Sequence, residues 1–226
     1  MEKLLSEDIQ KQVVDALQQV KEPVQVLFFS SQENCDYCND TKQLLEEVVE
    51  LSDKVSIDVY DLDTDREIAQ KYQIEKAPAF IIAAKNGDEI VDYGIRFYGI
   101  PSGHEFSSLI HDLILVSGRD SGLNPQTREF LAELKNPVHL MVFVTPTCPY
   151  CPRAVVLAHQ MAMESPMVVA DGIEATEFPD LADQFFVSGV PQTTINMGAG
   201  TVIGAVPEQH LLNEIRKVAA EKVEAR

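Results

Sequence analysis

Two apolar runs of strand length stand out in the pattern of hydrophobic and polar positions, at residues 24–30 and 138–144. Both consist mainly of β-branched, aliphatic and aromatic side chains, which is typical of a strand buried on both faces of a parallel sheet. Around the first run the spacing predicts helices at about 7–20, 36–51, 64–73 and 102–116, and strands at 24–30, 55–61, 79–84 and 89–96. Around the second it predicts helices at about 125–135, 151–161, 179–186 and 207–222, and strands at 138–144, 167–170 and 192–197, with a further strand after these.

The two halves of the chain repeat one another. A proline precedes each apolar run, and a Cys-x-Tyr-Cys segment follows it, at Cys35–Cys38 and at Cys148–Cys151. Pro78 lies 43 residues after Cys35, and Pro191 lies 43 residues after Cys148. Equal spacing over such a length indicates one supersecondary unit used twice. The polar, glycine-bearing stretch 117–124 is where we place the boundary between the units, and its shortness predicts that they pack together.

The net charge of the chain indicates which kinds of binding partner are unsuitable. The 226-residue chain carries a formal net charge of -18, which argues against a nucleic-acid backbone or an anionic membrane surface as its main partner. The first residues lack the charged and apolar regions of a signal peptide, and no apolar run approaches the roughly 18 residues of a membrane span. We therefore expect a cytoplasmic protein, in which four cysteines serve catalysis or metal binding and not permanent crosslinks.

Each cysteine pair is predicted to lie at the start of a helix, where unpaired backbone N–H groups point outward. Such a place can lower the pKa of the first cysteine from about 8.5 into a range of roughly 3.5 to 7.5, and so populate its thiolate near neutral pH. We expect Cys35 and Cys148 to attack disulfide sulfurs, and Cys38 and Cys151 to resolve the mixed disulfides. Reduction potentials decide whether the protein reduces, forms or isomerises disulfides.

These segments resemble a known family. The sequence Cys148-Pro149-Tyr150-Cys151 is that of the glutaredoxin active site, and Val190-Pro191 falls where thioredoxin-fold proteins carry a cis-proline. The paired arrangement resembles the glutaredoxin-like protein disulfide oxidoreductases of thermophiles. The resemblance implies an α/β fold of two tandem thioredoxin-like units, residues 1–118 and 119–226, each with a central mixed β-sheet flanked by helices.

The resemblance also implies roles for further residues. Pro78 and Pro191 are expected to be cis and to expose the backbone of Ala77 and Val190 for strand-like pairing with a substrate peptide. Tyr37, Pro149 and Tyr150 are expected at the rim of the substrate site. The implied partners are protein disulfides and dithiols, with a flavoprotein of the thioredoxin-reductase type as electron donor. No bound cofactor is expected, because the redox equivalents reside in the cysteines.

The two centres are not expected to be equivalent. Asp36 places a negative charge beside Cys35, whereas Cys148 is followed by the neutral Pro149, so we expect the N-terminal thiol to be the less acidic. The buried acid that thioredoxin carries six residues before its first cysteine is missing, since those positions are Phe29 and Val142. The acidic residues from Glu174 to Glu177 are interpreted as solvated loop charge.

Two other interpretations remain open. One is an electron carrier to a peroxiredoxin, similar to the twin thioredoxin-fold region of the alkyl hydroperoxide reductase flavoprotein. The other is an iron–sulfur or zinc scaffold. A single four-cysteine zinc site is disfavoured, because zinc ribbons separate their pairs by about 15 to 20 residues and Cys38 and Cys148 are 110 apart.

Overall fold

The computed structural model describes residues 3–33 and 35–224. Its helices are α1 (Glu7–Leu17), α2 (Cys38–Val49), α3 (Arg66–Tyr72), the 3-10 turn η1 (Gly103–Glu105), α4 (Phe106–Gly118), α5 (Pro125–Ala132), α6 (Cys151–Glu164), α7 (Pro179–Gln184) and α8 (Glu208–Glu224). Its strands are β1 (Val24–Ser30), β2 (Val55–Asp61), β3 (Ala79–Asn86), β4 (Glu89–Val91), β5 (Ile95–Tyr98), β6 (Val138–Val144), β7 (Val168–Glu174), β8 (Gln192–Ile195) and β9 (Gly200–Ile203). The two apolar runs thus form β1 and β6 with the predicted bounds. None of the described helices has the length and apolar character needed to cross a membrane.

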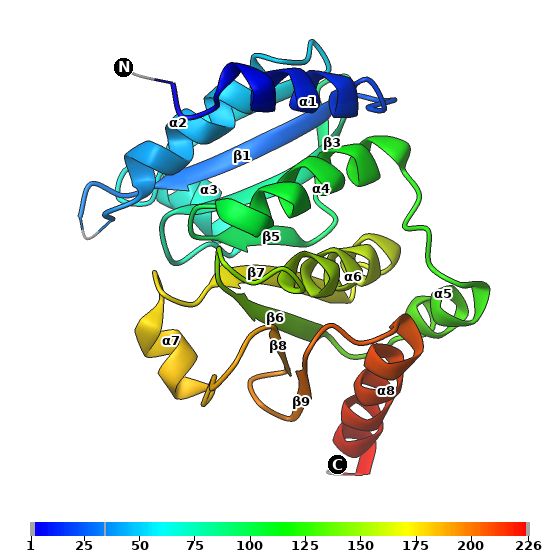
Figure 1. Cartoon of the computed structure of the whole chain (residues 1–226). Coiled ribbons are helices and arrows are strands. Elements are labelled where there is room, and N and C mark those ends of the chain that lie inside the picture. The colour runs from blue at the N-terminus through cyan, green and yellow to red at the C-terminus, as the bar shows by residue number, and fades with distance from the viewer. Residues whose placement is uncertain (1–2, 34, 225–226) are drawn as a thin grey trace.

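The strands of both units form one continuous sheet, in the order β2-β1-β3-β5-β7-β6-β8-β9, with β4 paired to β3 at the side (Figure 1). Within each unit the first two strands pair in parallel, and the next two add in antiparallel fashion. Strand β5 of the first unit pairs in parallel with β7 of the second. Because β1, β5, β7 and β6 all run the same way, the carboxyl ends of β1 and β6 lie at the same edge of the sheet.

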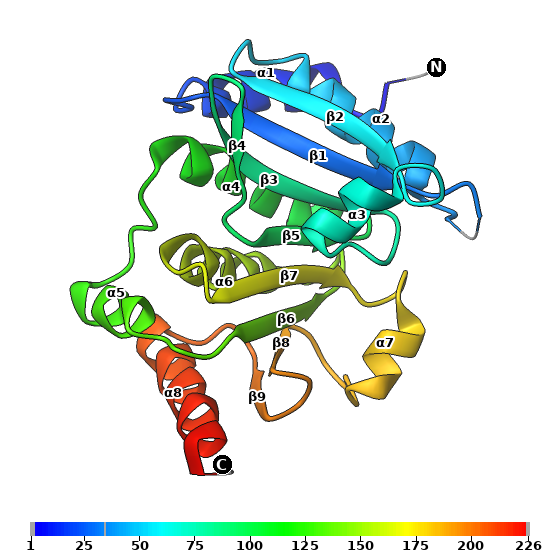
Figure 2. The same cartoon turned by 180° about the vertical axis from the view of Figure 1, so that it is seen from behind.

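Helices cover the two faces of this sheet unequally. On the face seen in Figure 1, helices α1, α2, α4 and α6 lie in front of the strands, and one apolar core extends through both units, from Leu17 and Leu45 to Leu109 and Leu212. The opposite face, seen in Figure 2, carries two smaller cores, one under α3 and one under α7. The shared core and the shared sheet confirm that the units pack together.

Between α3 and α7 the second face of the sheet is hollowed into a groove with a volume of about 890 Å³. Its floor carries the ion pair of His139 and Asp171, whose Nε2 and Oδ2 are 2.5 Å apart. Burial lowers the pKa of His139, but the hydrogen bond and the charge of Asp171 outweigh burial, so the pKa lies above the ordinary histidine value. Arg96 also lies on this floor and pairs with Asp92.

The predicted strand 89–96 is wrong in one respect, because it is two strands separated by a turn. The side chain of Asp92 accepts the N–H of Gly94 at 2.7 Å, and Gly94 has a φ of +79°, which favours glycine. A Cβ at Gly94 would meet the carbonyl oxygen of Val168 at 2.6 Å, so only glycine fits where β7 begins. This turn lets the chain leave β4 and continue as β5, the strand that joins the two units.

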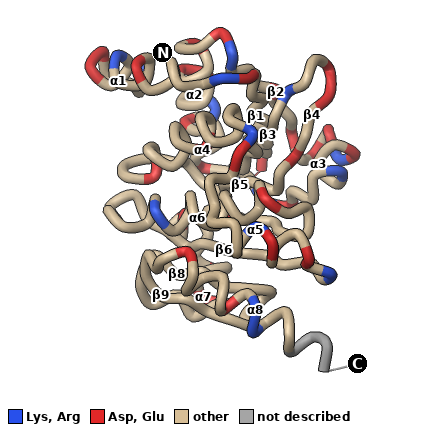
Figure 3. The backbone as a smooth tube through the Cα atoms, turned by 90° about the vertical axis from the view of Figure 1, so that its right-hand side faces the viewer, with Lys and Arg blue, Asp and Glu red and all other residues tan. Residues whose placement is uncertain are grey.

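Acidic residues occur throughout the described chain, as Figure 3 shows from α1 to α8. The net charge of -18 therefore belongs to the whole molecule.

Candidate redox sites

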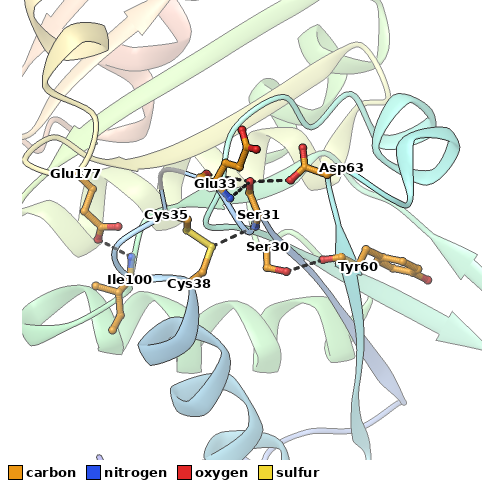
Figure 4. Close-up of a disulfide and its surroundings, with 9 residues drawn as sticks. All are labelled: Ser30, Ser31, Glu33, Cys35, Cys38, Tyr60, Asp63, Ile100 and Glu177. Atoms are coloured by element: carbon orange, nitrogen blue, oxygen red, sulfur yellow. Dashed lines mark hydrogen bonds between the residues drawn. A yellow bond between two sulfur atoms is a disulfide. The ribbon is translucent and has the colours of Figure 1, made fainter.

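The N-terminal cysteines lie where β1 ends and α2 begins. Cys35 and Cys38 form a disulfide with Cα atoms 5.4 Å apart, and the N–H of Ser31 donates to Cys38 Sγ at 3.4 Å (Figure 4). Cys38 is 6% exposed, whereas Cys35 is half-buried. Tyr37, which is 46% exposed, is the residue before the helix. Cys35 is therefore the more accessible sulfur of the pair.

The C-terminal cysteines repeat this arrangement between β6 and α6. Cys148 and Cys151 form a disulfide with Cα atoms 5.5 Å apart, and the N–H of Cys151, the first residue of the helix, donates to Cys148 Sγ at 3.1 Å. Cys151 is fully buried and Cys148 is 7% exposed, while Tyr150 is 64% exposed and Pro149 is also exposed. A backbone N–H aimed at Cys148 Sγ favours negative charge on that sulfur once the disulfide is reduced.

A cis-proline accompanies each disulfide. The peptide bonds Ala77–Pro78 and Val190–Pro191 are both cis, and Cys148 Sγ lies 3.8 Å from the carbonyl oxygen of Val190. The prolines anchor a second segment in the same way in both units, since Pro78 O accepts the N–H of Gly99 at 2.9 Å and Pro191 O accepts that of Gly204 at 2.8 Å. The sequence repeat is thus also a repeat of the geometry around the sulfurs.

The surroundings of the two disulfides differ in charge. Near the N-terminal pair, Ser31 Oγ donates to Asp63 at 3.0 Å, and Glu33 lies beside it (Figure 4). A groove of about 610 Å³ begins at Ser31, and it is lined by Ser31, Glu33, Leu62, Asp63, Arg66, Ala69, Gln70, Gln73, Ile74, Glu75 and Ala77. At the C-terminal pair the neighbouring residues of the motif are uncharged, and the exposed Arg153 follows on the first turn of α6. That Cys35 is the less acidic thiol stays a prediction. The negative charges near the N-terminal pair are consistent with it, because they disfavour a thiolate.

Two carboxyl groups near the cysteine motifs were missed in the sequence pattern. Glu105, in η1 of the first unit, is 3% exposed. The preceding residue, His104, donates its N–H at 2.9 Å to the carbonyl oxygen of Pro146, which lies two residues before Cys148. Glu177, after β7 of the second unit, accepts the N–H of Ile100 beside the N-terminal disulfide at 2.7 Å (Figure 4). Burial raises the pKa of each to about 7.

The interpretation of Glu174 to Glu177 as solvated loop charge is therefore wrong for both ends of that segment. Glu174 is 4% exposed and accepts hydrogen bonds from Thr176 and from the N–H of Glu177, and Glu177 is only partly exposed. Nothing in the local sequence distinguishes these carboxylates from exposed ones. They belong to the second unit, and residues of the first unit, such as Gly99, pack against them. His104 and His210, which lie at or near the start of the last helix of each half, are both exposed.

Among residues 3–33 and 35–224, no group of three or more histidine, cysteine, aspartate or glutamate side chains is arranged to hold a metal ion. The chemistry that the sites offer is that of two vicinal sulfur pairs at the same edge of one sheet, and in each pair the first cysteine is more exposed than the second. Fold and sites together define a thiol–disulfide oxidoreductase with two thioredoxin-type centres.

Comparison with known proteins gives the family. Residues 9–114 match the family model described as a thioredoxin-like domain, and residues 138–217 match that described as a thioredoxin domain. A protein disulfide oxidoreductase from Aeropyrum pernix K1 superposes with a TM-score of 0.86 and 32% identity over 96% of this chain and 94% of that one. The chain belongs to the family of protein disulfide oxidoreductases built from two thioredoxin-like units.

The chain is also similar to part of a larger reductase. The F subunit of the alkyl hydroperoxide reductase of Pseudomonas aeruginosa is 27% identical over 201 residues, 89% of this chain, and that of Staphylococcus epidermidis is 29% identical over 175 residues, 77% of this chain. The chain spans about a third of the length of these proteins, 35% and 31% respectively. The N-terminal domain of the corresponding Enterococcus faecalis protein shares the fold, with a TM-score of 0.83 at 24% identity over 92% of this chain and 98% of that domain.

Proposed function

We propose that the protein reduces, forms or isomerises protein disulfides by dithiol exchange at two unequal centres. The observation that carries this proposal is the repeated geometry: each disulfide lies beside a cis-proline, and in each pair the first cysteine is more exposed than the second. In this proposal Cys35 and Cys148 are the attacking thiols, and Cys38 and Cys151 are the resolving thiols. The likeness to a protein disulfide oxidoreductase over almost the whole chain supports protein disulfides as the substrates.

In the reducing direction, the Cys148 thiolate attacks one sulfur of a substrate disulfide. The substrate S–S bond breaks, a mixed disulfide forms, and the departing substrate thiolate takes a proton from solvent. Cys151 then loses its proton and attacks Cys148 Sγ, which releases the second substrate thiolate and forms the Cys148–Cys151 disulfide. Two electrons have passed from the protein to the substrate, and the same steps in reverse oxidise a substrate dithiol.

The substrate peptide is proposed to lie against the backbone at Ala77 or Val190, which the adjacent cis-proline leaves facing the sulfurs. The 3.8 Å contact between Cys148 Sγ and the Val190 carbonyl oxygen supports this placement at the C-terminal centre. Exposed Tyr37, Tyr150 and Pro149 would then border the bound peptide. We place this activity in the cytoplasm, where exchangeable cysteine pairs serve redox catalysis and not permanent crosslinking.

The test is reduction of insulin disulfides by dithiothreitol with three proteins: wild type, Cys35→Ser/Cys38→Ser and Cys148→Ser/Cys151→Ser. We expect loss of catalysis without the C-terminal pair and weakened catalysis without the N-terminal pair, because acidic surroundings disfavour the Cys35 thiolate. Wild type that gives no acceleration over dithiothreitol alone would show that the protein is not a general disulfide reductase.

A second candidate function is electron transfer to a peroxiredoxin, with a flavoprotein of the thioredoxin-reductase type as donor. The similarity to the alkyl hydroperoxide reductase proteins favours it. Reduced protein would be mixed with an oxidised bacterial peroxiredoxin and with insulin, and the rates of disulfide reduction compared. A rate on the peroxiredoxin that exceeds the rate on insulin at equal disulfide concentration would favour the carrier role, and the reverse order would favour general disulfide exchange.

A further inference from the structure

The N-terminal centre receives one carboxyl group from the other unit. Glu177 lies after β7 of the second unit, yet its Oε1 accepts the N–H of Ile100 of the first unit at 2.7 Å. Figure 4 shows Glu177 and Ile100 beside the Cys35–Cys38 disulfide, on the side away from Ser31. The contact therefore crosses the junction between the units and ends next to a sulfur pair.

The segment that Glu177 holds is part of the N-terminal site. Gly99, the residue before Ile100, donates its N–H to the carbonyl oxygen of the cis-proline Pro78 at 2.9 Å. A Cβ at Gly99 would lie 2.6 Å from Glu174 Cβ and 2.9 Å from Glu177 Oε1, so the two acids close tightly over this glycine. Glu177 thus fixes a segment that is itself bonded to the proline beside the cysteines.

The other oxygen of Glu177 is not satisfied by the protein. Oε2 is buried and has no hydrogen-bond partner among the described residues. Burial, opposed by the Ile100 hydrogen bond and reinforced by the charge of Glu174, raises the pKa of Glu177 to about 7. A carboxyl group of this kind gains and loses its proton in the pH range in which thiol–disulfide exchange operates.

The charged groups around the centre are mainly acidic. From the segment before α2 come Glu33 and Asp36, and from the loop after β2 come Asp63 and the basic Arg66, whose Nε donates to Asp63 O at 3.1 Å. Glu174 lies behind Glu177. Of the acids, Glu33, Asp36 and Asp63 are exposed to water, which screens their charges, whereas Glu177 is only partly exposed, so its charge acts more strongly on the sulfurs.

We propose that Glu177 is a positioning residue of the N-terminal redox centre, which holds the 99–101 segment in place and couples its own charge to the charge on the reduced Cys35–Cys38 pair. The proposal deepens the proposed function, since it takes Cys35 as a reactive thiol. Neutral Glu177 leaves the thiolate undisturbed, and ionised Glu177 disfavours it through like-charge repulsion. The second unit thereby sets the pH range in which the centre of the first unit is nucleophilic.

The experiment follows alkylation of the fully reduced full-length protein between pH 5.5 and 8.5, with Cys35 and Cys148 resolved by mass spectrometry. Glu177→Gln keeps an oxygen for the Ile100 N–H and removes the charge. We expect the midpoint of the Cys35 rate profile in this variant to lie roughly half to one pKa unit below that of wild type, the Cys35 rates at pH 5.5 to be equal, and Cys148 to be unchanged, because a neighbouring like charge moves a thiol pKa by about that much.

Glu33→Gln is the matched control, since it removes an exposed carboxylate near the same disulfide. It should change the Cys35 rate by less than about two-fold, as expected for a solvent-screened charge. Equal Cys35 profiles in wild type and Glu177→Gln would overturn the proposal, as would an equal change at Cys148. Cys35 that resists alkylation in both proteins would instead contradict its role as an attacking thiol.

A measurement on the wild type needs no variant. The carboxyl carbon of Glu177 is followed by NMR through a pH titration, with the N-terminal pair first oxidised and then reduced. Negative charge on the reduced pair should move the midpoint of Glu177 upward by roughly half a pKa unit or more. A midpoint that is the same in both redox states would overturn the proposal.

Discussion

Glu105 gives a direct test of how a buried carboxyl group affects folding stability. Its Oε2 accepts the hydroxyl of Ser108 at 2.9 Å, and its Oε1 is buried with no partner among the described residues. Burial is the largest influence and raises its pKa from 4.5 to about 7, against the hydrogen bond from Ser108 and the nearby His159. Since one pKa unit corresponds to about 1.4 kcal/mol, ionising Glu105 costs about 3 kcal/mol more free energy in the folded protein than in the unfolded chain.

The sign follows from proton binding. Between pH 4.5 and about 7 the folded state keeps a proton on Glu105 that the unfolded chain has released, so the free energy of unfolding falls as the pH rises through this window. Glu105→Gln retains the shape of the neutral acid and has no proton to lose. We therefore expect the variant to gain about 2 to 3 kcal/mol over wild type between pH 5 and pH 8.

Urea unfolding of both oxidised proteins at fixed pH values measures this difference. A gain of 2 to 3 kcal/mol corresponds to an upward move of roughly 1 M in the urea midpoint for a chain of this size. Glu89→Gln, at an exposed position, should leave the pH dependence of the midpoint as in wild type. Wild type and Glu105→Gln curves that run parallel from pH 5 to pH 8 would refute the assignment of a buried, proton-holding carboxyl group.

Two further predictions concern the junction and the groove. Gly94→Ala should lower the free energy of unfolding by at least about 2 kcal/mol more than Gly87→Ala does. Both glycines have a positive φ, but a Cβ at Gly94 would meet the backbone oxygen of Val168 at 2.6 Å, whereas a Cβ at Gly87 would meet nothing within 4 Å. Equal urea midpoints for the two variants would contradict the close contact between the units at Gly94. Asp171→Asn should lower the pKa of His139, which proton NMR measures. In wild type the charged His139 stabilises the folded protein at low pH, and this stabilisation is lost as the pH rises through the folded pKa of His139; the variant should lack it. An unchanged His139 midpoint would show that Asp171 does not hold the proton there.

The repeat made most of the fold predictable. Local signals suffice for β1 and β6, since their residues are apolar and bounded by turns, and for the helices that begin at Cys38 and Cys151. The pairing of β5 with β7 was not predictable, because two edge strands from different units meet through backbone groups that every sequence carries. The division into two units at residue 118 stays a prediction of the sequence, since the strands and the core run across it without interruption.

The same distinction applies to the sites. Cys-x-x-Cys and the later proline are local and repeated, so the sequence is enough to place the sulfurs and the prolines together. Glu105 and Glu177 carry no such mark, because each is enclosed by tertiary packing and neither lies in a motif. Residues whose chemistry depends on packing between units are the ones that single-sequence reasoning misses.

The pairing of β5 with β7 has a consequence for how the protein is made. During synthesis the first unit leaves the ribosome before residues 168–174 exist, so the β5 edge, Ile95 to Tyr98, stays unpaired until the second half of the chain arrives. The same open edge would be present in any fragment that ends near residue 118, and would invite a second copy to take the place of β7. The two halves are thus better understood as one assembly that is completed in stages than as two modules joined by a linker.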